Sequence, residues 1–219
     1  MSSTYPGPSP LDPGALERLW DFDDPAGSEH RFRTVLDTER SPLAGAELVT
    51  QLARSLGLQG RFAEADALLD GIQIDASSHP VLAVRTDLER GRLRNSSGHP
   101  DQAARLFGSA LRAAEAAGLD FLAADAAHML AIAEPDRAEE WTRHGLAIAA
   151  ASDESRCRRW AGSLHNNLGW TRQEAGDLPG ALAEFEAALS AYREFGTAEQ
   201  ARFAQQAIDQ CRTAMRGAE

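Results

Sequence analysis

Lysine is missing from this chain: all 22 of its basic residues are arginine, and a GC-rich coding bias accounts for that without a functional cause. Basic residues are also outnumbered, because 33 acidic residues give a formal net charge of −11. A chain with this charge has no general attraction for nucleic acid or for an anionic membrane surface. We therefore expect neither nucleic acid nor a membrane as a partner.

Cysteine is nearly as scarce, and Cys157 and Cys211 are its only representatives. Two cysteines so far apart provide neither a disulfide framework nor a zinc site, and we expect the reducing environment of the cytoplasm. The six histidines form no i, i+4 pair with a helpful carboxylate, and no glycine-rich phosphate loop occurs. The sequence therefore predicts no metal and no cofactor.

Aromatic residues make up only 6% of the chain and β-branched residues are few, whereas alanine and leucine are abundant. That mixture favours helices over sheet. No apolar run is long enough to cross a bilayer. The opening stretch, MSSTYPGPSPLDPG, lacks the basic start and apolar core of a signal peptide, and its composition predicts a flexible tail.

What the sequence does contain is an internal repeat. Four segments share a glycine or alanine at a turn, an alanine five residues later and a bulky residue about four positions beyond that. The segments are GRFAEADALLDGI from Gly60, GHPDQAARLFGSA from Gly98, AEPDRAEEWTRHG from Ala133 and GDLPGALAEFEAA from Gly176. Their aligned alanines are Ala65, Ala103, Ala138 and Ala181, with separations of 38, 35 and 43 residues.

The fourth segment, extended to NNLGWTRQEAGDLPGALAEFEAAL, illustrates one whole unit. Gly176 supplies the left-handed backbone that ends a first helix. Pro179 opens a second helix, where its missing N–H needs no partner, and Ala181, Phe185 and Ala188 form the inner stripe of that helix. In these motifs the chain resembles the tetratricopeptide repeat family over roughly residues 45 to 195. The runs ERGRLRNSSG, DAAHMLAIAEP and RRWAGSLHNNLGW are similar to those of uncharacterised bacterial tetratricopeptide proteins.

The resemblance implies an all-α fold, a right-handed α-α superhelix of antiparallel helix pairs. We expect capping helices at 11–40, because Asp12 and Asp24 each precede a proline, which is a strong helix start. The expected segments are a tail at 1–10, caps at 11–40, four repeats within 41–196 (about 45–78, 80–118, 120–151 and 153–196) and a C-terminal capping helix at 197–219.

The resemblance also implies that the first helix of each pair lines a concave groove. Groove positions follow the small packing residue by one and about four positions, or precede it by three. With Ala53, Gly91 and Gly169 as the small residues, the predicted ligand-binding side chains are Arg54, Arg85, Arg92, Asn95, Ser96, Asn166, Asn167 and Trp170. The register of the third repeat stays open, but Asp125 and His128 share a helix face and join the predicted site.

We expect this groove to belong to a cytoplasmic binding module that recognises a peptide, a protein tail or a small anionic ligand. Arginine would hold a carboxylate or phosphate, the amides and hydroxyls would orient the ligand, and Trp170 would offer a stacking surface. The predicted wall uses asparagine and serine in place of glutamate, although both are poorer helix formers. This choice favours a ligand site over a merely solvated face.

An enzyme is the alternative, in which Asp125 orients His128 as a general base inside an enclosed pocket and Arg92 anchors the substrate. No nucleophile is identifiable at a fixed spacing, so a hydrogen-bonded structural pair is the simpler interpretation of Asp125 and His128. We assign no catalytic residue beyond these two candidates. Cys157 lies in RCRRW, where the arginines would lower the pKa of its thiol.

Overall fold

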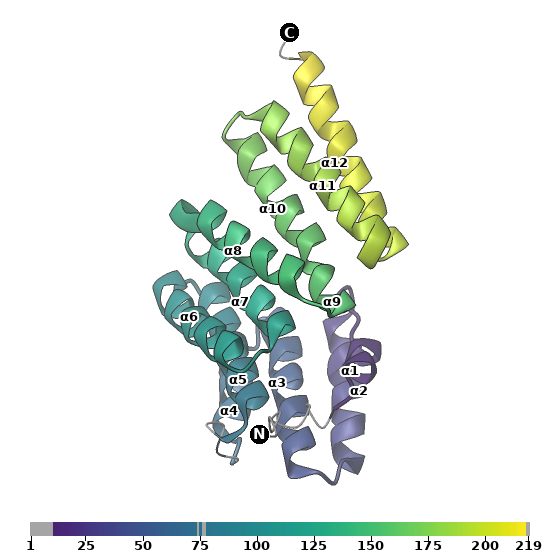
Figure 1. The fold of residues 1–219 in the computed structure, drawn as a ribbon. Helices are drawn as coiled ribbons and strands as arrows, with labels where there is room; N and C mark the ends of the chain where they lie inside the picture. The colour runs from purple at the N-terminus through teal and green to yellow at the C-terminus, as the bar shows by residue number, and fades with distance from the viewer. Residues whose placement is uncertain (1–10, 74, 76–77, 218–219) are drawn as a thin grey trace, which may run out of the picture. The chain divides into compact units, whose positions relative to one another are not determined.

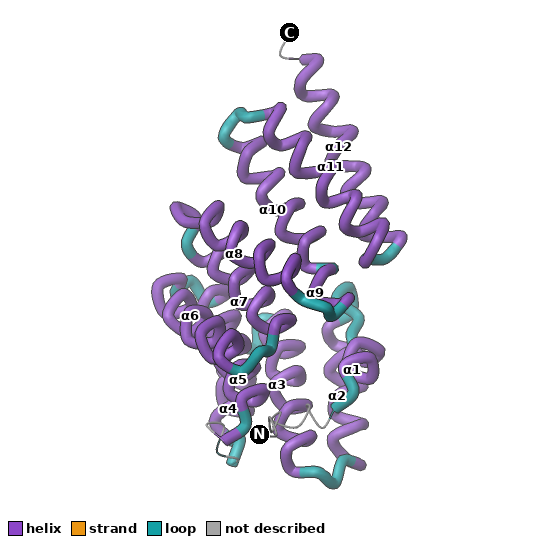
Figure 2. The backbone as a smooth tube through the Cα atoms, viewed as in Figure 1, coloured by secondary structure: helices purple, strands orange, loops and turns teal. Residues whose placement is uncertain are grey.

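A computed structural model of the protein describes residues 11–73, 75 and 78–217. In that part of the chain every regular element is a helix and no strand occurs, as Figure 2 shows. The all-α fold class predicted from composition and repeats is confirmed. The chain divides into two compact units, Met1–Ala117 and Gly118–Glu219. The predicted tail at 1–10 lies outside the described residues.

The first unit begins with helices whose starts follow the capping pattern expected from the sequence. The side chain of Asp12 accepts hydrogen bonds from the backbone N–H groups of Gly14 and Ala15, and that of Asp24 accepts one from Gly27. The helices of this unit are α1 (Pro13–Leu19), α2 (Pro25–Thr38), α3 (Pro42–Leu58), α4 (Phe62–Asp70), α5 (Pro80–Ser96) and α6 (Pro100–Ala116) (Figure 1). The first two helices pack on α3 through a core of Leu16, Phe32, Leu48 and Leu52.

The second unit contains helices that pack in chain order. They are α7 (Asp120–Ala133), the single 3₁₀ turn η2 (Pro135–Arg137), α8 (Ala138–Ala151), the short α9 (Ser155–Arg158), α10 (Trp160–Glu174), α11 (Leu178–Phe195) and α12 (Ala198–Gly217). Helix α11 contacts both α10 and α12, and Figure 1 shows it between them. The apolar stripe of α12, which includes the buried Ala204, Ile208 and Cys211, lies against α11.

Two helix pairs share one close contact, which explains why the sequence places glycine inside a helix. A Cβ atom on Gly91 of α5 would lie 2.4 Å from the ring of Phe107 on α6, and one on Gly169 of α10 would lie 2.5 Å from the ring of Phe185 on α11. Glycine and ring are 16 residues apart in both pairs. These pairs therefore repeat the same packing geometry, and only glycine allows it.

The third pair, α7 and α8, departs from this geometry for an identifiable reason. Its ring position, four residues after the repeat alanine, holds the buried Thr142, and a 3₁₀ turn replaces the glycine turn between its helices. The register is nevertheless clear, because Thr142, Gly145 and Ala149 are buried at offsets of 4, 7 and 11 from Ala138. Phe107, Ala110 and Ala114 are buried at the same offsets from Ala103.

Candidate functional site

The predicted site residues are divided between the two units. Arg54, Arg85, Arg92, Asn95 and Ser96 belong to the first unit, and Asp125, His128, Asn166, Asn167 and Trp170 belong to the second. No helix among the described residues is both long and apolar enough to span a membrane. The same residues contain no group of three or more His, Cys, Asp and Glu placed to hold a metal ion.

In the first unit, two of the predicted arginines contact buried glutamates. Arg92 Nη1 lies 2.7 Å from Glu89 Oε1, and Arg85 Nε lies 3.8 Å from Glu47 Oε2. The side chains of Glu47 and Glu89 are 1% and 3% exposed. Buried glutamates of α3 and α5 therefore lie beside the predicted wall, although none occupies a predicted groove position. A ligand anion at either arginine would have to compete with a carboxylate that is already in place.

Arg54 has a different environment, which the sequence did not indicate. Its guanidinium lies 5.5 Å from the ring centroid of Trp20 and 5.3 Å from that of Phe22, and the two rings are stacked 4.8 Å apart. The segment between α1 and α2 thus supplies an aromatic surface for this arginine. At the end of α5, Asn95 is half-buried and Ser96 is exposed.

In the second unit, His128 lies in a cluster of aromatic and amide groups. Its Nδ1 is 3.3 Å from Asn167 Nδ2, and its ring centroid is 5.1 Å from that of Trp160. When the amide of Asn167 donates, Nδ1 accepts and Nε2 carries the proton. Asp125 is buried. By the repeat offsets, the groove positions of this pair fall on the buried Ala123, Ala127 and Leu130, and not on Asp125 or His128.

The thiol of Cys157 does not have the lowered pKa suggested by the arginines beside it. Cys157 is fully buried, and burial raises its pKa to about 11, although a hydrogen bond with Ser152 acts in the opposite direction. The carboxylates of Asp120 and Glu154 raise the pKa further. The expectation was wrong because neighbours in sequence do not determine whether a side chain is solvated.

A groove with a volume of about 460 Å³ lies on α10, α11 and α12, and it includes the predicted residues Asn166 and Trp170. Asn166 and Trp170 come from α10, Tyr192 from α11, and Gln200, Phe203, Gln206, Ala207 and Gln210 from α12. The lining residues of α10 and those of α12 are called the α10 wall and the α12 wall below, and Tyr192 and Ala207 are the buried residues of the lining. Among the described residues that line this groove, none carries a formal charge at neutral pH.

The local structure fixes several of the groove residues. The ring of Trp170 packs edge-on against Phe185, with centroids 5.0 Å apart and planes at 65°. The hydroxyl of Tyr192 lies 3.1 Å from Ser163 Oγ; burial raises the pKa of Tyr192, and the Ser163 hydrogen bond only partly offsets this. Gln200 caps α12 reciprocally with Thr197, because the N–H of each residue donates to the other's side chain.

Three further amides of the groove have no hydrogen-bond partner among the described residues. Within the described part of the chain, the side-chain amides of Asn166, Gln206 and Gln210 make no hydrogen bond to protein. Phe203 is 55% exposed, although it is a large apolar residue. Sequence reasoning missed the whole α12 wall. The available signal was the i, i+3, i+7 spacing of Phe203, Gln206 and Gln210, which lies beside the buried stripe of the same helix.

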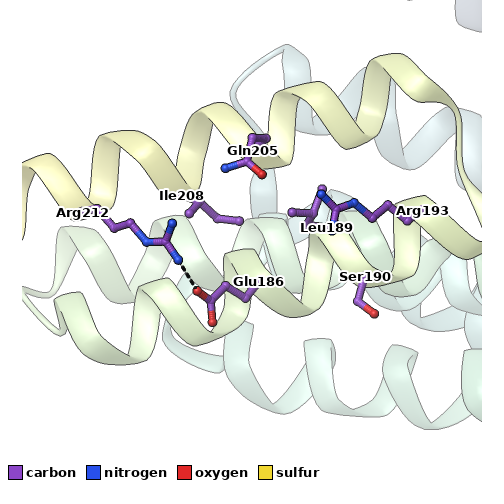
Figure 3. Close-up of a pocket in the computed structure, with 7 residues that line it drawn as sticks. All are labelled: Glu186, Leu189, Ser190, Arg193, Gln205, Ile208 and Arg212. Atoms are coloured by element: carbon purple, nitrogen blue, oxygen red, sulfur yellow. Dashed lines mark hydrogen bonds and ion pairs between the residues drawn. The ribbon is translucent and has the colours of Figure 1, made fainter.

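A second hollow, of about 330 Å³, lies between α11 and α12 and is charged (Figure 3). Leu189 and Ile208 are its buried apolar residues. Figure 3 shows Arg212 paired with Glu186, at 2.8 Å, toward one end and Arg193 toward the other. Its chemistry therefore differs from that of the groove on α10 and α12.

Comparison with known proteins identifies a fold and no activity. No protein-family model matches the chain, and no curated protein matches its sequence. Among solved structures, the crystal structure of BtubC (BKLC) from P. vanneervenii is similar, with a TM-score of 0.58 and 21% sequence identity over 93% of each chain. Together with the repeated helix-pair contacts, this likeness shows that the chain has an all-α fold of the helical-repeat kind.

Proposed function

We propose that the protein is a tetratricopeptide-type binding module that captures an extended peptide segment of a partner protein in the groove on α10, α11 and α12. The observation that carries this proposal is the groove itself, which combines an anchored Trp170, an exposed Phe203 and amides that make no hydrogen bond to the described residues. Aromatic rings provide contact area, and amides provide donors and acceptors for a peptide backbone. The matching contacts of Gly91 with Phe107 and of Gly169 with Phe185 support the tetratricopeptide assignment.

A peptide is better supported than a small anionic ligand. Arg85 and Arg92 each lie against a buried glutamate, so their charge is already balanced within the first unit. No arginine is among the described residues that line the groove of the second unit, and Arg202, whose guanidinium lies 5.6 Å from the Phe203 ring centroid, pairs with Glu199 at 3.5 Å. We place the module in the cytoplasm because both cysteines are free and buried, which fits a reducing compartment.

An enzyme at the groove receives less support. General acid–base catalysis needs a group that titrates near the working pH, and Tyr192 is the one ionisable residue among the described groove residues. Burial raises the pKa of Tyr192 above its ordinary value of 10, so its hydroxyl keeps its proton at neutral pH.

Affinity capture from the source cell extract, followed by mass spectrometry, tests the proposal. The bait is the full chain in three forms: unchanged, Trp170→Ala and Trp141→Ala. Trp141 is a matched control because it is a half-buried tryptophan on α8 and does not line the groove. We expect partners that the unchanged protein and Trp141→Ala retain and Trp170→Ala loses. Equal retention by all three forms would refute the groove as the binding site.

A further inference from the structure

We infer that the groove selects an uncharged run of about three residues in an extended conformation, with a proline or aliphatic side chain held between Trp170 and Phe203. This inference deepens the proposed function and rests on it. It specifies the chemistry of the bound segment, which peptide binding alone leaves open.

The described residues that line the groove are uncharged. The eight residues that line the groove include four amides and three aromatic rings and, among these described residues, no arginine, aspartate or glutamate. An ion that enters such a surface loses hydration and gains no opposite charge, and this loss is costly. An acidic segment is disfavoured further, because the chain as a whole carries a formal charge of −11. Beside the groove, the guanidinium of Arg202 lies 5.6 Å from the centroid of the Phe203 ring and pairs with Glu199 at 3.5 Å, so its charge is already balanced. We infer that the groove disfavours charge of either sign.

The length of the groove along α12 limits how many residues of a peptide it can hold. Gln200 is engaged in the cap of α12, and the rest of the α12 face of the groove runs from Phe203 to Gln210, seven residues apart. At about 1.5 Å of rise per residue, they span about 10 Å of helix. An extended chain advances about 3.3 Å per residue, and a polyproline II chain advances about 3.1 Å. About three residues of such a peptide therefore match the length of this face.

Two aromatic rings of the groove can hold an apolar side chain of the segment. Trp170 lines the groove from α10 and Phe203 lines it from α12, and we place one apolar side chain of the segment against both rings. Proline and aliphatic side chains pack on aromatic faces without needing a polar partner, and aromatic-lined grooves bind extended proline-containing segments in this way. Asn166, Gln206 and Gln210 then remain available to pair with the peptide backbone.

The test is a selection from a library of random heptapeptides displayed on phage, with the full-length protein as bait. Each selected pool is counted on three baits: the unchanged protein, Trp170→Ala and the control Trp141→Ala. Selected peptides are then synthesised with blocked ends. Their dissociation constants are measured before and after the central residue of the shared run is replaced by Asp or by Arg.

We expect enriched peptides to share a run of about three uncharged residues with a proline or aliphatic member. Capture should fall at least tenfold on Trp170→Ala and stay unchanged on Trp141→Ala, and either charged replacement should weaken binding at least tenfold. Peptides that depend on Trp170 but carry a required acidic or basic residue in the run would overturn this inference and leave the proposed function standing. If no enriched peptide depends on Trp170, both are refuted.

Discussion

The contact between Gly91 and Phe107 allows a quantitative test of the packing that defines the helix pairs. A Cβ on Gly91 would lie 2.4, 2.6 and 2.9 Å from three carbons of the Phe107 ring, and Phe107 is itself fully buried. Gly91→Ala must therefore displace a ring that is fully buried. Such overpacking costs about 1–3 kcal/mol.

Gly45 provides the matched control, because a Cβ there has no neighbour within 4 Å. Gly45 and Gly91 both lie inside helices of the first unit, so the gain of up to about 1 kcal/mol in helix propensity on changing Gly to Ala is common to both. The difference between the two variants then isolates the ring contact. We expect Gly91→Ala to be less stable than Gly45→Ala by about 1–3 kcal/mol.

Urea denaturation followed by circular dichroism measures both variants, and the double variant Gly91→Ala with Phe107→Leu identifies the partner. Gly91→Ala should lower the free energy of unfolding less in the Phe107→Leu background than in the unchanged protein, because the smaller leucine leaves room for the added methyl group. Equal stability of Gly91→Ala and Gly45→Ala would show that the helices do not approach as closely as described.

Three further predictions concern charge and burial. Arg92→Ala should lower the free energy of unfolding by about 3–5 kcal/mol, because it leaves the Glu89 carboxylate buried without this partner. In urea denaturation, adding Glu89→Leu to the Arg92→Ala variant should recover much of this loss. A loss below about 0.5 kcal/mol from Arg92→Ala alone would refute the pairing. Burial alone would raise the pKa of Glu29, but hydrogen bonds from Gln59 and Arg33 and the charge of Arg61 outweigh it and lower this pKa below its ordinary value of 4.5. The contribution of the Glu29 carboxylate to the stability of the fold is therefore fully present above pH 4.5 and is lost as pH falls through its folded pKa. Urea midpoints of Glu29→Gln should accordingly fall less between pH 5 and pH 3 than those of the unchanged protein, and parallel curves would contradict this. At pH 8 the Cys157 thiol, with a pKa of about 11, should react with iodoacetamide about a hundredfold more slowly than an ordinary cysteine, because little of it is thiolate. Mass spectrometry should detect rapid labelling only after unfolding, and rapid labelling of the native protein would contradict the burial of Cys157.

The helix pairs follow from the sequence because their determinants are local. Gly176 ends one helix with a φ of 82°, and Ala181 and Phe185 are fully buried on the next, as their spacing predicts. These features depend on residues within about one turn of each other, where periodicity and turn chemistry are informative. The third pair was harder to align because Thr142 replaces the ring and the glycine turn is missing.

The site was less predictable because its contacts join residues that are distant in sequence. Arg85 meets Glu47 across 38 positions, and Arg54 meets Trp20 across 34, and no pattern within one helix reports either contact. The position of Trp170 on the groove side of α10 could be predicted because it follows from the neighbouring Gly169. Phe203 was overlooked because α12 was read for its buried stripe alone, although an exposed face beside such a stripe can also line a groove.

In helix α12, the residues that attach the helix to α11 differ from the two exposed glutamines that line the groove. Ala204, Ala207, Ile208 and Cys211 attach this helix to α11, whereas Gln206 and Gln210 make no side-chain hydrogen bond to the described protein. Substitutions at these two glutamines therefore leave the packing of the helix intact, and exposed substitutions of this kind usually change stability by less than about 0.5 kcal/mol. Under the proposed function, exchange of Gln206 or Gln210 for arginine or glutamate would shift the preference of the groove toward charged segments with little effect on folding. Under the same proposal, the ligand preference set by α12 can change during evolution while the packing of the helix on α11 stays the same.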